Sequence, residues 1–335
     1  MALKINKKLS LKKTKNNKTV KKLSRKNSRA ARETVRKSSL KNPIEHEDVA
    51  VPPDEAADTE NLQVRFTVAS DIGKRDYQED RFIVNQLQTR KELWLFAVFD
   101  GHGGSKCSEF CKNELEKILL DELEKKKDIK NIHLEALLKF SLNFLCRIWD
   151  ERVMGKKYKA VYKSSESRKK FYENFDYEKH TREGNDSGTT ATVVLIDTKR
   201  KKLVMGNCGD SRSVVLPNKK SSFISTTDHV VPLKLNITNF EVNVSDGRVE
   251  SDLAMSRSLG DHSKELSGVI SREFDMTSID IKHGARVIMG SDGLFDVFSN
   301  ADVFVNNETA QQLIDRKKEQ IEDNITVIVI DTENT

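Results

Sequence analysis

The sequence lacks paired cysteines. Its four cysteines form no CxxC pair and no Cys/His spacing of the kind that binds zinc. They lie at positions 107, 111, 146 and 208. Cys107 and Cys111 are four residues apart in a predicted helix, where two small, buried, apolar side chains are expected. We therefore predict four reduced cysteines, which is typical of an intracellular protein.

Long apolar runs are also missing. No stretch approaches the roughly 20 apolar residues that span a bilayer. The N-terminus is too basic and too interrupted for a secretory signal, which needs an apolar run of about 7–15 residues. Position 2 is Ala2, so the glycine of the N-myristoylation motif is absent. These absences predict an intracellular protein that is not secreted and has no transmembrane segment.

Acidic residues are nearly absent from residues 1–42, the basic arm. This arm contains 16 Lys or Arg and one acid, Glu33, so its net charge is +15. The rest of the chain contains 42 basic and 51 acidic residues, a net charge of −9. The arm has no aromatic residue and few large apolar ones, so it cannot bury enough surface to offset the entropy of ordering. We expect it to be disordered in isolation.

Three interpretations of the basic arm remain open. It is a nuclear or nucleolar address with affinity for nucleic acid, or a segment that docks on another acidic surface, such as acidic protein tails or anionic lipid. The third is a transit peptide, which ranks last because Lys outnumbers Arg and no sustained amphipathic pattern is evident. Nucleus and cytoplasm are both compatible with these interpretations, as is membership of a larger assembly.

Residues 43–60 form a second biased segment. It has seven acids, no Lys or Arg, and three of the five prolines of the chain. This composition predicts an extended linker, although the segment could also fold back on the basic arm.

From about residue 61 the pattern becomes globular. Apolar runs or alternating patterns predict strands at 64–70, 80–86, 93–100, 190–197, 202–208, 211–217, 285–292 and 324–331. A helix capped by Ser105 is predicted to run to about residue 127, and a second helix is predicted at about 131–154. Both have one apolar face and should lie against a sheet. The polar stretch 155–186 has no clear periodicity and is predicted to be an insertion, either a partner-docking surface or a solvated loop.

The order of these elements indicates the fold class. Strands come first, then two helices, then mostly strands, which is not the regular alternation of a doubly wound α/β protein. We predict an α+β protein, with a central β-sandwich of two mainly antiparallel sheets flanked by helices.

Five short acidic motifs are spread over this globular part. They are RDYQED at 75–80, FDGHGG at 99–104, CGDSR at 208–212, SDGLFD at 291–296 and EDN at 322–324. Three of them place an aspartate directly after a predicted strand, at Asp100, Asp210 and Asp292. A carboxylate at a strand end is held by a rigid element and can point into a shared cleft. Several together would make an oxygen-rich site suited to Mg²⁺ or Mn²⁺.

Each motif alone also has an ordinary structural explanation. DGHGG could be a strand-to-helix turn with a helix cap, although His102 can act as an acid or base near neutral pH. Arg75 precedes Glu79 and Asp80 and could form a surface ion pair, although Arg is a natural ligand for phosphate. The remaining motifs could be turns with local ion pairs.

The motifs occur together, in order, with further matching text. The chain resembles the metal-dependent Ser/Thr protein phosphatases of type 2C. The resemblance rests on eight segments and covers nearly the whole of 61–332; they are RDYQED, FAVFDGHGG, SGTTATVVLI, GNCGDSRSVVL, TTDH, LAMSRSLGD, IMGSDGLFDVFSN and DNITVIVI.

The resemblance implies a role for each site residue. Asp100 would bridge two metal ions, with the Gly101 carbonyl as a further ligand. The other residues implied in the metal set are Glu79 and Asp80, partly through water, and Asp292 and Asp323. Asp210 would support a looser third metal together with Asp292.

The remaining implied roles concern the substrate. Arg75 would bind the substrate phosphate, His102 would protonate the leaving Ser or Thr alkoxide, and Thr190 would line the cleft. The implied activity is hydrolysis of phosphoserine and phosphothreonine in proteins by a metal-activated water, with a phosphoprotein as substrate and a monomeric catalytic domain.

The sequence departs from the family outside these residues. After Asp228-His229 the family usually has an acidic-x-x-Arg-Ile helix and a Gly-Gly turn, and residues 230–252 have neither. This stretch and 262–275 border the family's mobile flap. The segment between Asp296 and Asp323 also looks one helix shorter than in the family. The alternative function is therefore a catalytically weak or inactive scaffold that keeps the fold and is anchored through its basic arm.

Overall fold

The structure is a computed structural model. It describes residues 61–126, 132–155, 186–231, 253–262 and 270–334, with a few isolated positions between them. The chain divides into Met1–Ala57 and Asp58–Thr335, and all described residues belong to the second unit. The basic arm, the linker 43–60 and nearly all of the predicted insertion lie outside the described residues, as does most of 232–252.

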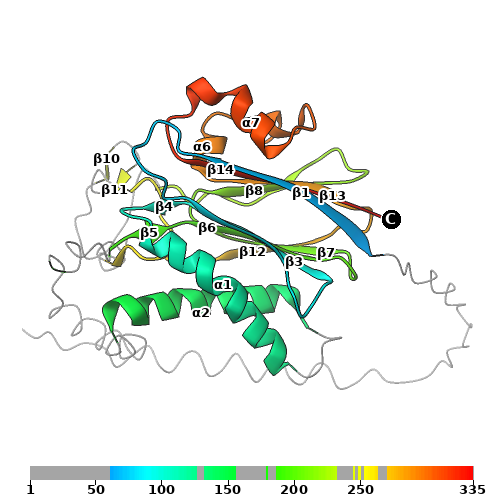
Figure 1. Ribbon diagram of the computed structural model, residues 1–335, viewed down its shortest axis with the longest axis horizontal. Coiled ribbons are helices and arrows are strands. Elements are labelled where there is room, and N and C mark those ends of the chain that lie inside the picture. Colours follow the sequence, from blue (N-terminus) through cyan, green and yellow to red (C-terminus); the bar gives the residue numbers. More distant parts are fainter. Residues whose placement is uncertain are drawn as a thin grey trace, which may run out of the picture. The chain divides into compact units, whose positions relative to one another are not determined.

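Two five-stranded antiparallel sheets form the body of this unit (Figure 1). The first has the order β1 (Leu62–Asp71), β14 (Ile325–Asn334), β13 (Ala285–Gly290), β8 (Arg212–Pro217) and β9 (Ile224–Ser225). The second has the order β12 (Asp275–Asp280), β7 (Lys202–Cys208), β6 (Ala191–Asp197), β3 (Leu93–Phe99) and β2 (Arg81–Gln86). Two short ribbons add β4 (Gly101–His102) with β5 (Gly188–Thr189) and β10 (Val244–Ser245) with β11 (Arg248–Val249).

Strand β3 shows why the central strands have unbroken apolar runs. Successive side chains of a strand point to opposite faces. Phe96 and Val98 enter the core between the two sheets, whereas Leu95 and Phe99 enter the core between the second sheet and the helices. Because both faces are covered, the strand is apolar at almost every position.

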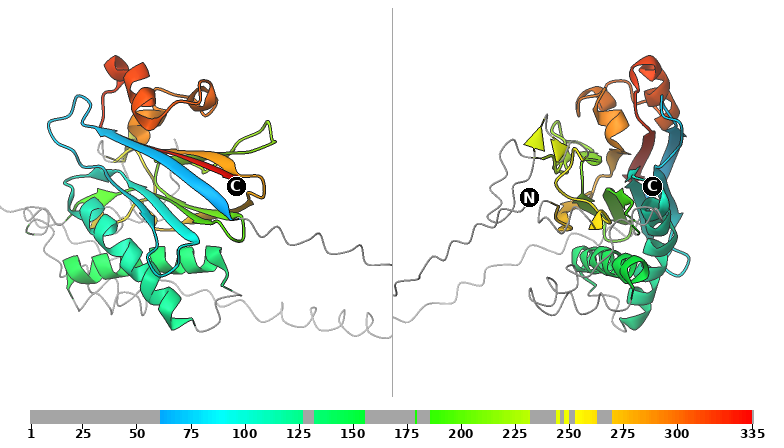
Figure 2. Two further views of the ribbon diagram at one scale, coloured as in Figure 1. Left: turned by 45° about the vertical axis from the view of Figure 1, so that its right-hand side comes forward. Right: turned by 90° about the vertical axis from the view of Figure 1, so that its left-hand side faces the viewer.

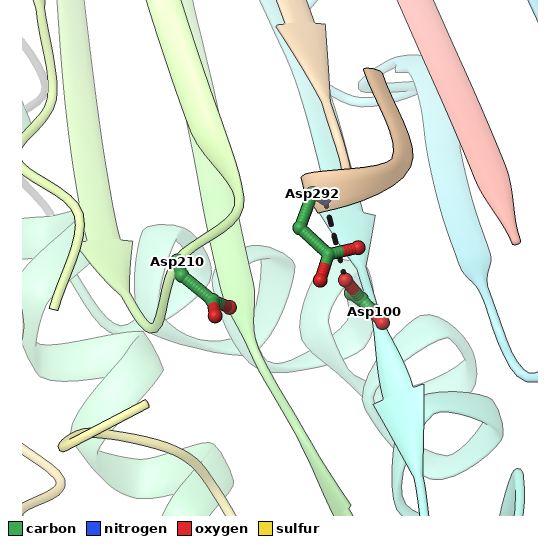
Figure 3. Close-up of side chains that lie close together, drawn as sticks. All are labelled: Asp100, Asp210 and Asp292. Carbon is green, nitrogen blue, oxygen red and sulfur yellow. Dashed lines mark hydrogen bonds between the residues drawn. The ribbon is translucent and has the colours of Figure 1, made fainter. Parts of the chain in front are cut away.

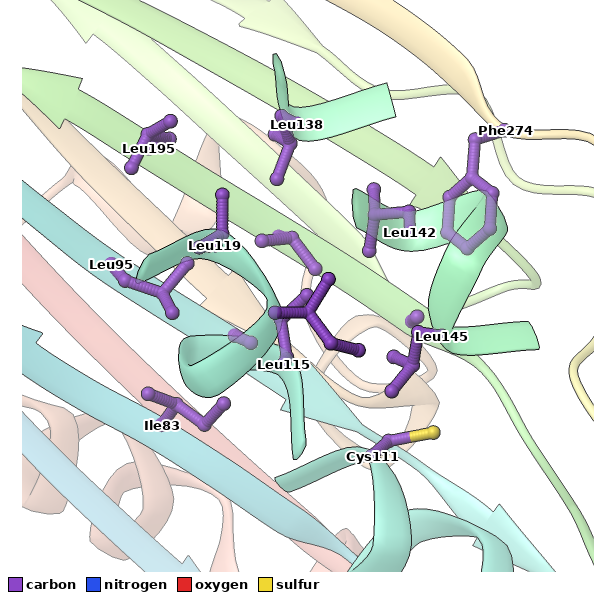
Figure 4. Packing of buried hydrophobic residues seen from close by; sticks show 14 of the residues in the cluster. Ile83, Leu95, Cys111, Leu115, Leu119, Leu138, Leu142, Leu145, Leu195 and Phe274 are labelled. Carbon is purple, nitrogen blue, oxygen red and sulfur yellow. The ribbon is translucent and has the colours of Figure 1, made fainter. Parts of the chain in front are cut away.

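Helices α1 (Lys106–Lys125) and α2 (Leu134–Met154) cover the outer face of the second sheet (Figure 1). Leu115 and Leu119 of α1 meet Leu142 and Leu145 of α2 above strand residues such as Leu195 (Figure 4). Each fully buried Leu of this kind contributes roughly 1.5–3 kcal/mol relative to an exposed one. The apolar faces predicted from helical spacing are those that the structure buries.

The predicted cap of α1 is wrong in its chemistry. Ser105 is the N-cap residue, but its side chain makes no capping hydrogen bond. A hydroxyl from a distant part of the sequence accepts one of the N-terminal N–H groups of the helix instead, because the Cys107 N–H donates to Ser187 Oγ at 3.2 Å. Helix α2 begins at His133, whose Nδ1 accepts a hydrogen bond from the Ala136 N–H.

The outer face of the first sheet is covered by shorter helices (Figures 1 and 2). These are α6 (Asp292–Phe295) and α7 (Ala310–Arg316), with 3-10 turns at Asp302–Phe304 and Lys318–Gln320. Thr309 and Gln312 form a capping box at the start of α7. The layers are therefore helix, sheet, sheet, helix, and the predicted fold class is confirmed.

Strand β12 was not predicted. Its sequence, DMTSID, is polar, and it lies at the edge of its sheet, where it pairs only with β7. An edge strand with most residues partly or fully exposed carries little apolar signal. All four cysteines are free and buried, as predicted for reduced cysteines.

Candidate metal centre

Three aspartates from three strand ends meet at one end of the sandwich (Figure 3). Asp100 follows β3, Asp210 follows β7 after one glycine, and Asp292 follows β13 after one serine. One carboxylate oxygen from each lies within 4.8 Å of the others. Strands β3 and β13 belong to different sheets, so the sandwich itself brings these distant parts of the sequence together.

Asp100 is held by a pair of threonines. Its N–H donates to Thr190 Oγ1 at 3.1 Å, and its carbonyl accepts from the Thr190 N–H at 2.9 Å and from Thr189 Oγ1 at 3.0 Å. The prediction that Thr190 lines the cleft is wrong, because its side chain has no exposed surface. Its hydroxyl turns inward to the Asp100 backbone and to Ser211 Oγ, 2.6 Å away.

Asp210 sits on a turn that requires glycine. Gly209 has φ +112, a conformation that L side chains rarely adopt, and a Cβ there would lie 2.6 Å from Thr190 Cβ. His229 stabilises this turn, since its Nδ1 accepts a hydrogen bond from the Gly209 N–H at 3.1 Å. The other ring nitrogen, Nε2, lies 2.9 Å from Asp275 Oδ2, which fixes the orientation of the ring.

Asp292 begins the short helix α6, and its N–H faces Asp100 Oδ2 at 3.5 Å (Figure 3). The next residue, Gly293, allows the chain to pass Asn324, because a Cβ there would lie 2.3 Å from the Asn324 carbonyl oxygen. Backbone packing therefore sets the direction of the Asp292 side chain.

The carboxylates repel one another. Burial, and then the charges of Asp292 and Asp80, raise the pKa of Asp100 well above its usual range. Burial and the charge of Asp210 do the same to the pKa of Asp292. Burial is also the main reason that the pKa of Asp210 is raised to about 6. A divalent cation would relieve this repulsion.

Two carboxylate oxygens support the fit of a cation. Asp80 Oδ1 and Asp210 Oδ1 are buried and have no hydrogen-bond partner among the described residues. A buried carboxylate oxygen without a partner is costly unless a cation or proton compensates it. The residues present therefore fit a hard divalent cation with oxygen ligands.

Asp80 and Glu79 lie beside the three aspartates. Asp80 Oδ2 accepts from Ser291 Oγ at 2.9 Å, and burial raises the Asp80 pKa to about 6. Glu79 Oε1 accepts from the Gly104 N–H. The Glu79 carbonyl fits closely over Gly101, where a Cβ would lie 2.5 Å from its oxygen.

Arg75 and Asp323 form an ion pair at the edge of the centre. The Arg75 side chain is 54% exposed, so its guanidinium is accessible to a solvent-borne anion. Asp323 Oδ1 accepts from the Asn324 N–H at 2.7 Å, and the Asp323 charge contributes to the raised pKa values of Asp100 and Asp292. The structure thus places Asp323 within electrostatic reach of the aspartates.

Known proteins match this chain over the same region. The family model for protein phosphatase 2C matches residues 66–324. The chain belongs to the protein phosphatase 2C family. It is 30% identical over 270 residues to Protein phosphatase 2C 3 of Arabidopsis thaliana. This match covers 76% of this chain and 56% of the plant protein. The predicted enzyme class, protein-serine/threonine phosphatase, is thereby confirmed.

Solved structures support the fold. The serine-threonine phosphatase 2C from Toxoplasma gondii aligns with a TM-score of 0.57 and 18% identity, covering 80% of this chain and 94% of that one. The catalytic domain of the serine threonine protein phosphatase PstP, determined in complex with 2 manganese ions, aligns with a TM-score of 0.50 and 22% identity, covering 81% and 99%.

Two residues that contact the candidate site, Asp261 and Asn324, were not singled out from the sequence. His102 Nε2 lies 2.7 Å from Asp261 Oδ2. Burial lowers the His102 pKa, but the charge and hydrogen bond of Asp261 outweigh it, so the net shift is upward. Asn324 was missed too: its Oδ1 accepts from the Glu79 N–H at 2.8 Å, and its Nδ2 donates to two carbonyls of the 72–77 loop. Asp261 lies in the segment LAMSRSLGD, which matched the family but offered no local reason to single it out.

Among the described residues, no helix has both the length and the apolar character needed to cross a bilayer.

Proposed function

We propose that this phosphatase 2C family member hydrolyses phosphoserine and phosphothreonine in proteins with the help of Mg²⁺ or Mn²⁺. The observation that carries the proposal is the convergence of Asp100, Asp210 and Asp292 within 4.8 Å. Carboxylate oxygens in this number and density are the ligands that these cations prefer. The manganese ions in the PstP structure support the same choice of metal.

The proposed metal set extends beyond these three residues. Asp80, Glu79, Asp323 and the Gly101 carbonyl would complete two sites, and Asp210 with Asp292 would support a third, weaker one. A divalent cation bound there would lower the pKa of a water molecule and neutralise charge on the phosphoryl oxygens.

Two side chains of this chain act on the substrate itself. Arg75 binds the phosphoryl oxygens, exchanging its Asp323 partner for the substrate anion. His102 donates a proton to the departing Ser or Thr oxygen, and its raised pKa favours the protonated form that this requires.

The proposal extends to the substrate, the oligomeric state and the location of the protein. We propose that the substrate is a phosphoprotein and that the catalytic domain is monomeric. We propose that the basic arm, with 16 Lys or Arg and one acid, binds nucleic acid or another acidic surface and so sets the location of the protein, in the nucleus or cytoplasm or within a larger assembly.

Phosphate release from a phosphoserine peptide tests the activity. Wild-type protein should release phosphate with Mn²⁺ and not with EDTA, and Asp100→Asn and Asp292→Asn should each reduce the rate at least about 100-fold, because each removes a charge from the centre. If purified protein shows no metal-dependent release, or if both variants match the wild type, the inactive-scaffold alternative stands instead.

A further inference from the structure

We propose that Asp261 is a positioning residue that holds His102 in its working orientation. The inference rests on the proposed function of His102 as the proton donor to the leaving group. Asp261 Oδ2 lies 2.7 Å from His102 Nε2, and the Asp261 side chain is only 6% exposed. This contact occupies Nε2, while Nδ1 is buried and has no hydrogen-bond partner among the described residues, so Nδ1 is the one ring nitrogen that no described residue occupies.

The Asp261 carboxylate is itself held in place. Ser258 Oγ donates to the same oxygen, Oδ2. The backbone of Asp261 has φ +46, which is unfavourable for any residue other than glycine and is tolerated best by Asn and Asp. A residue persists in this conformation only where its surroundings determine it. The turn is therefore built to present this carboxylate.

A common scaffold carries both partners of the pair. His102 lies opposite Gly188 in the β4–β5 ribbon. The neighbouring residue of β5, Thr189, exchanges two backbone hydrogen bonds of 2.9 Å with Leu259, two residues before Asp261. Gly188 leaves the space in which the pair meets, since a Cβ there would lie 2.1 Å from Asp261 Oδ2 and 2.2 Å from His102 Nε2.

Helix α2 braces the same turn from the other side. Asp150 is fully buried, and its Oδ1 lies 2.9 Å from His262 Nε2 while its Oδ2 accepts from Arg272 Nη1. Arg272 Nη2 also donates to the Gly260 carbonyl at 3.4 Å. The residues immediately before and after Asp261 are thus tied to one buried carboxylate, and Asp261 is left to face His102.

The dependence of the rate on the leaving group distinguishes this role from a purely structural one. Asp261→Asn is nearly isosteric and tolerates the left-handed backbone. It should reduce kcat at least about tenfold for a phosphoserine peptide, whose alkoxide needs a proton, with little change in KM. The loss should be much smaller for p-nitrophenyl phosphate, whose leaving group needs no proton. Asp280→Asn, an exposed aspartate on β12, is the matched control and should behave as the wild type on both substrates.

The double variant supplies the second comparison. His102→Ala should show the same leaving-group pattern, and adding Asp261→Asn to it should cost no further activity, because a positioning residue has no function without the group that it positions. Equal losses on both substrates, or additive losses in the double variant, would overturn the proposal. If the wild type is active, an Asp261→Asn variant with the same activity would also overturn the proposal.

A measurement without turnover separates this proposal from the proposed function. The chain has seven histidines, so ¹⁵N-histidine labelling gives a resolvable long-range ¹H–¹⁵N spectrum, with His102 assigned from its loss in His102→Gln. In wild-type protein the His102 Nε2 proton should be present and shifted downfield by its carboxylate partner, and Gly188→Ala should abolish this signal. If His102 Nε2 carries no such proton, the pair is refuted whatever the activity. A persistent pair in a protein without phosphatase activity would refute the proposed function alone.

Discussion

Thr190 serves the metal centre through a backbone group. Its hydroxyl accepts the Asp100 N–H, so Thr190→Val leaves a buried donor without a partner, at a cost of about 1–3 kcal/mol in the free energy of unfolding. Because the donor belongs to Asp100, we expect kcat to fall as well. Thr192→Val is the matched control: Thr192 lies two residues further along and its hydroxyl pairs with Ser213 Oγ at 2.7 Å, so this variant should lose stability and keep kcat. Denaturation and phosphopeptide turnover measure the two effects, and equal kcat losses would contradict this role.

Arg75 gives a second prediction for a single side chain. Arg75→Ala should raise KM for a phosphopeptide at least about tenfold and change kcat little, because the guanidinium binds the phosphoryl group rather than the leaving atom. Arg75→Lys should recover part of the loss, since a point charge remains but the two-pronged geometry does not. Arg65→Ala, at an exposed ion pair on β1, is the control. Steady-state kinetics measures KM and kcat, and a change confined to kcat would contradict this role.

Residues with a local sequence signal were predicted better than residues that act through distant partners. Asp100, Asp210 and Asp292 follow apolar strands, so their position at strand ends could be seen in the sequence, and the structure brings them together. The family resemblance placed Thr190 in the cleft, and the sequence could not show its inward hydrogen bonds to Asp100 and Ser211 because they depend on the tertiary fold. Asp261 was missed for the same reason, since it meets His102 across 159 residues.

Helices and strands, too, were predicted where the local sequence pattern is strong and missed where it is weak. The central strands and both long helices were predicted because two-sided burial or an amphipathic face leaves a strong apolar pattern. Strand β12 was missed because an exposed edge strand leaves almost none. The cap of α1 was assigned to Ser105 by position, whereas Ser187 reaches the N-terminal turn from elsewhere in the chain.

One buried charge, Asp150, joins helix α2 to His262 and Arg272 in addition to its apolar packing. Asp150→Asn would leave the Arg272 guanidinium without its compensating charge, so we expect a loss of about 3–5 kcal/mol in the free energy of unfolding. Asp121→Asn, at an exposed position on α1, should change it by less than about 0.5 kcal/mol. Urea denaturation compares the two, and similar small effects would show that the buried cluster does not brace the helix.

The β12 edge should show a characteristic dependence on pH. The His229 hydrogen bond, followed by Arg257, lowers the Asp275 pKa below its ordinary value of 3.8, although burial opposes them. A lowered folded-state pKa adds stability above the unfolded value, and this stability is lost as the pH falls through the folded value. The stability difference between wild type and Asp275→Asn should therefore be constant near pH 6 and shrink below about pH 4. Denaturation across this range tests it, and a difference that grew on acidification would contradict the assigned shift.

The whole chain combines a catalytic unit with an oppositely charged extension. Residues 1–42 carry a net +15 and the remainder a net −9. Deleting 1–42 should abolish binding to nucleic acid, which should fall steeply with salt in the full chain, and should leave phosphopeptide turnover unchanged. Fluorescence anisotropy at several salt concentrations measures the binding. Binding that survives the deletion would show that the arm is not its source.

The proposed cation site joins five dispersed motifs. Calorimetric titration with Mn²⁺ tests this most directly, using wild-type protein, Asp292→Asn, and Asp280→Asn as an exposed control. We predict saturable binding in the wild type and the control, and a loss of at least about tenfold in affinity in Asp292→Asn, because that variant removes one of the three converging carboxylates. No binding by the wild type, or equal binding by all three proteins, would contradict the account.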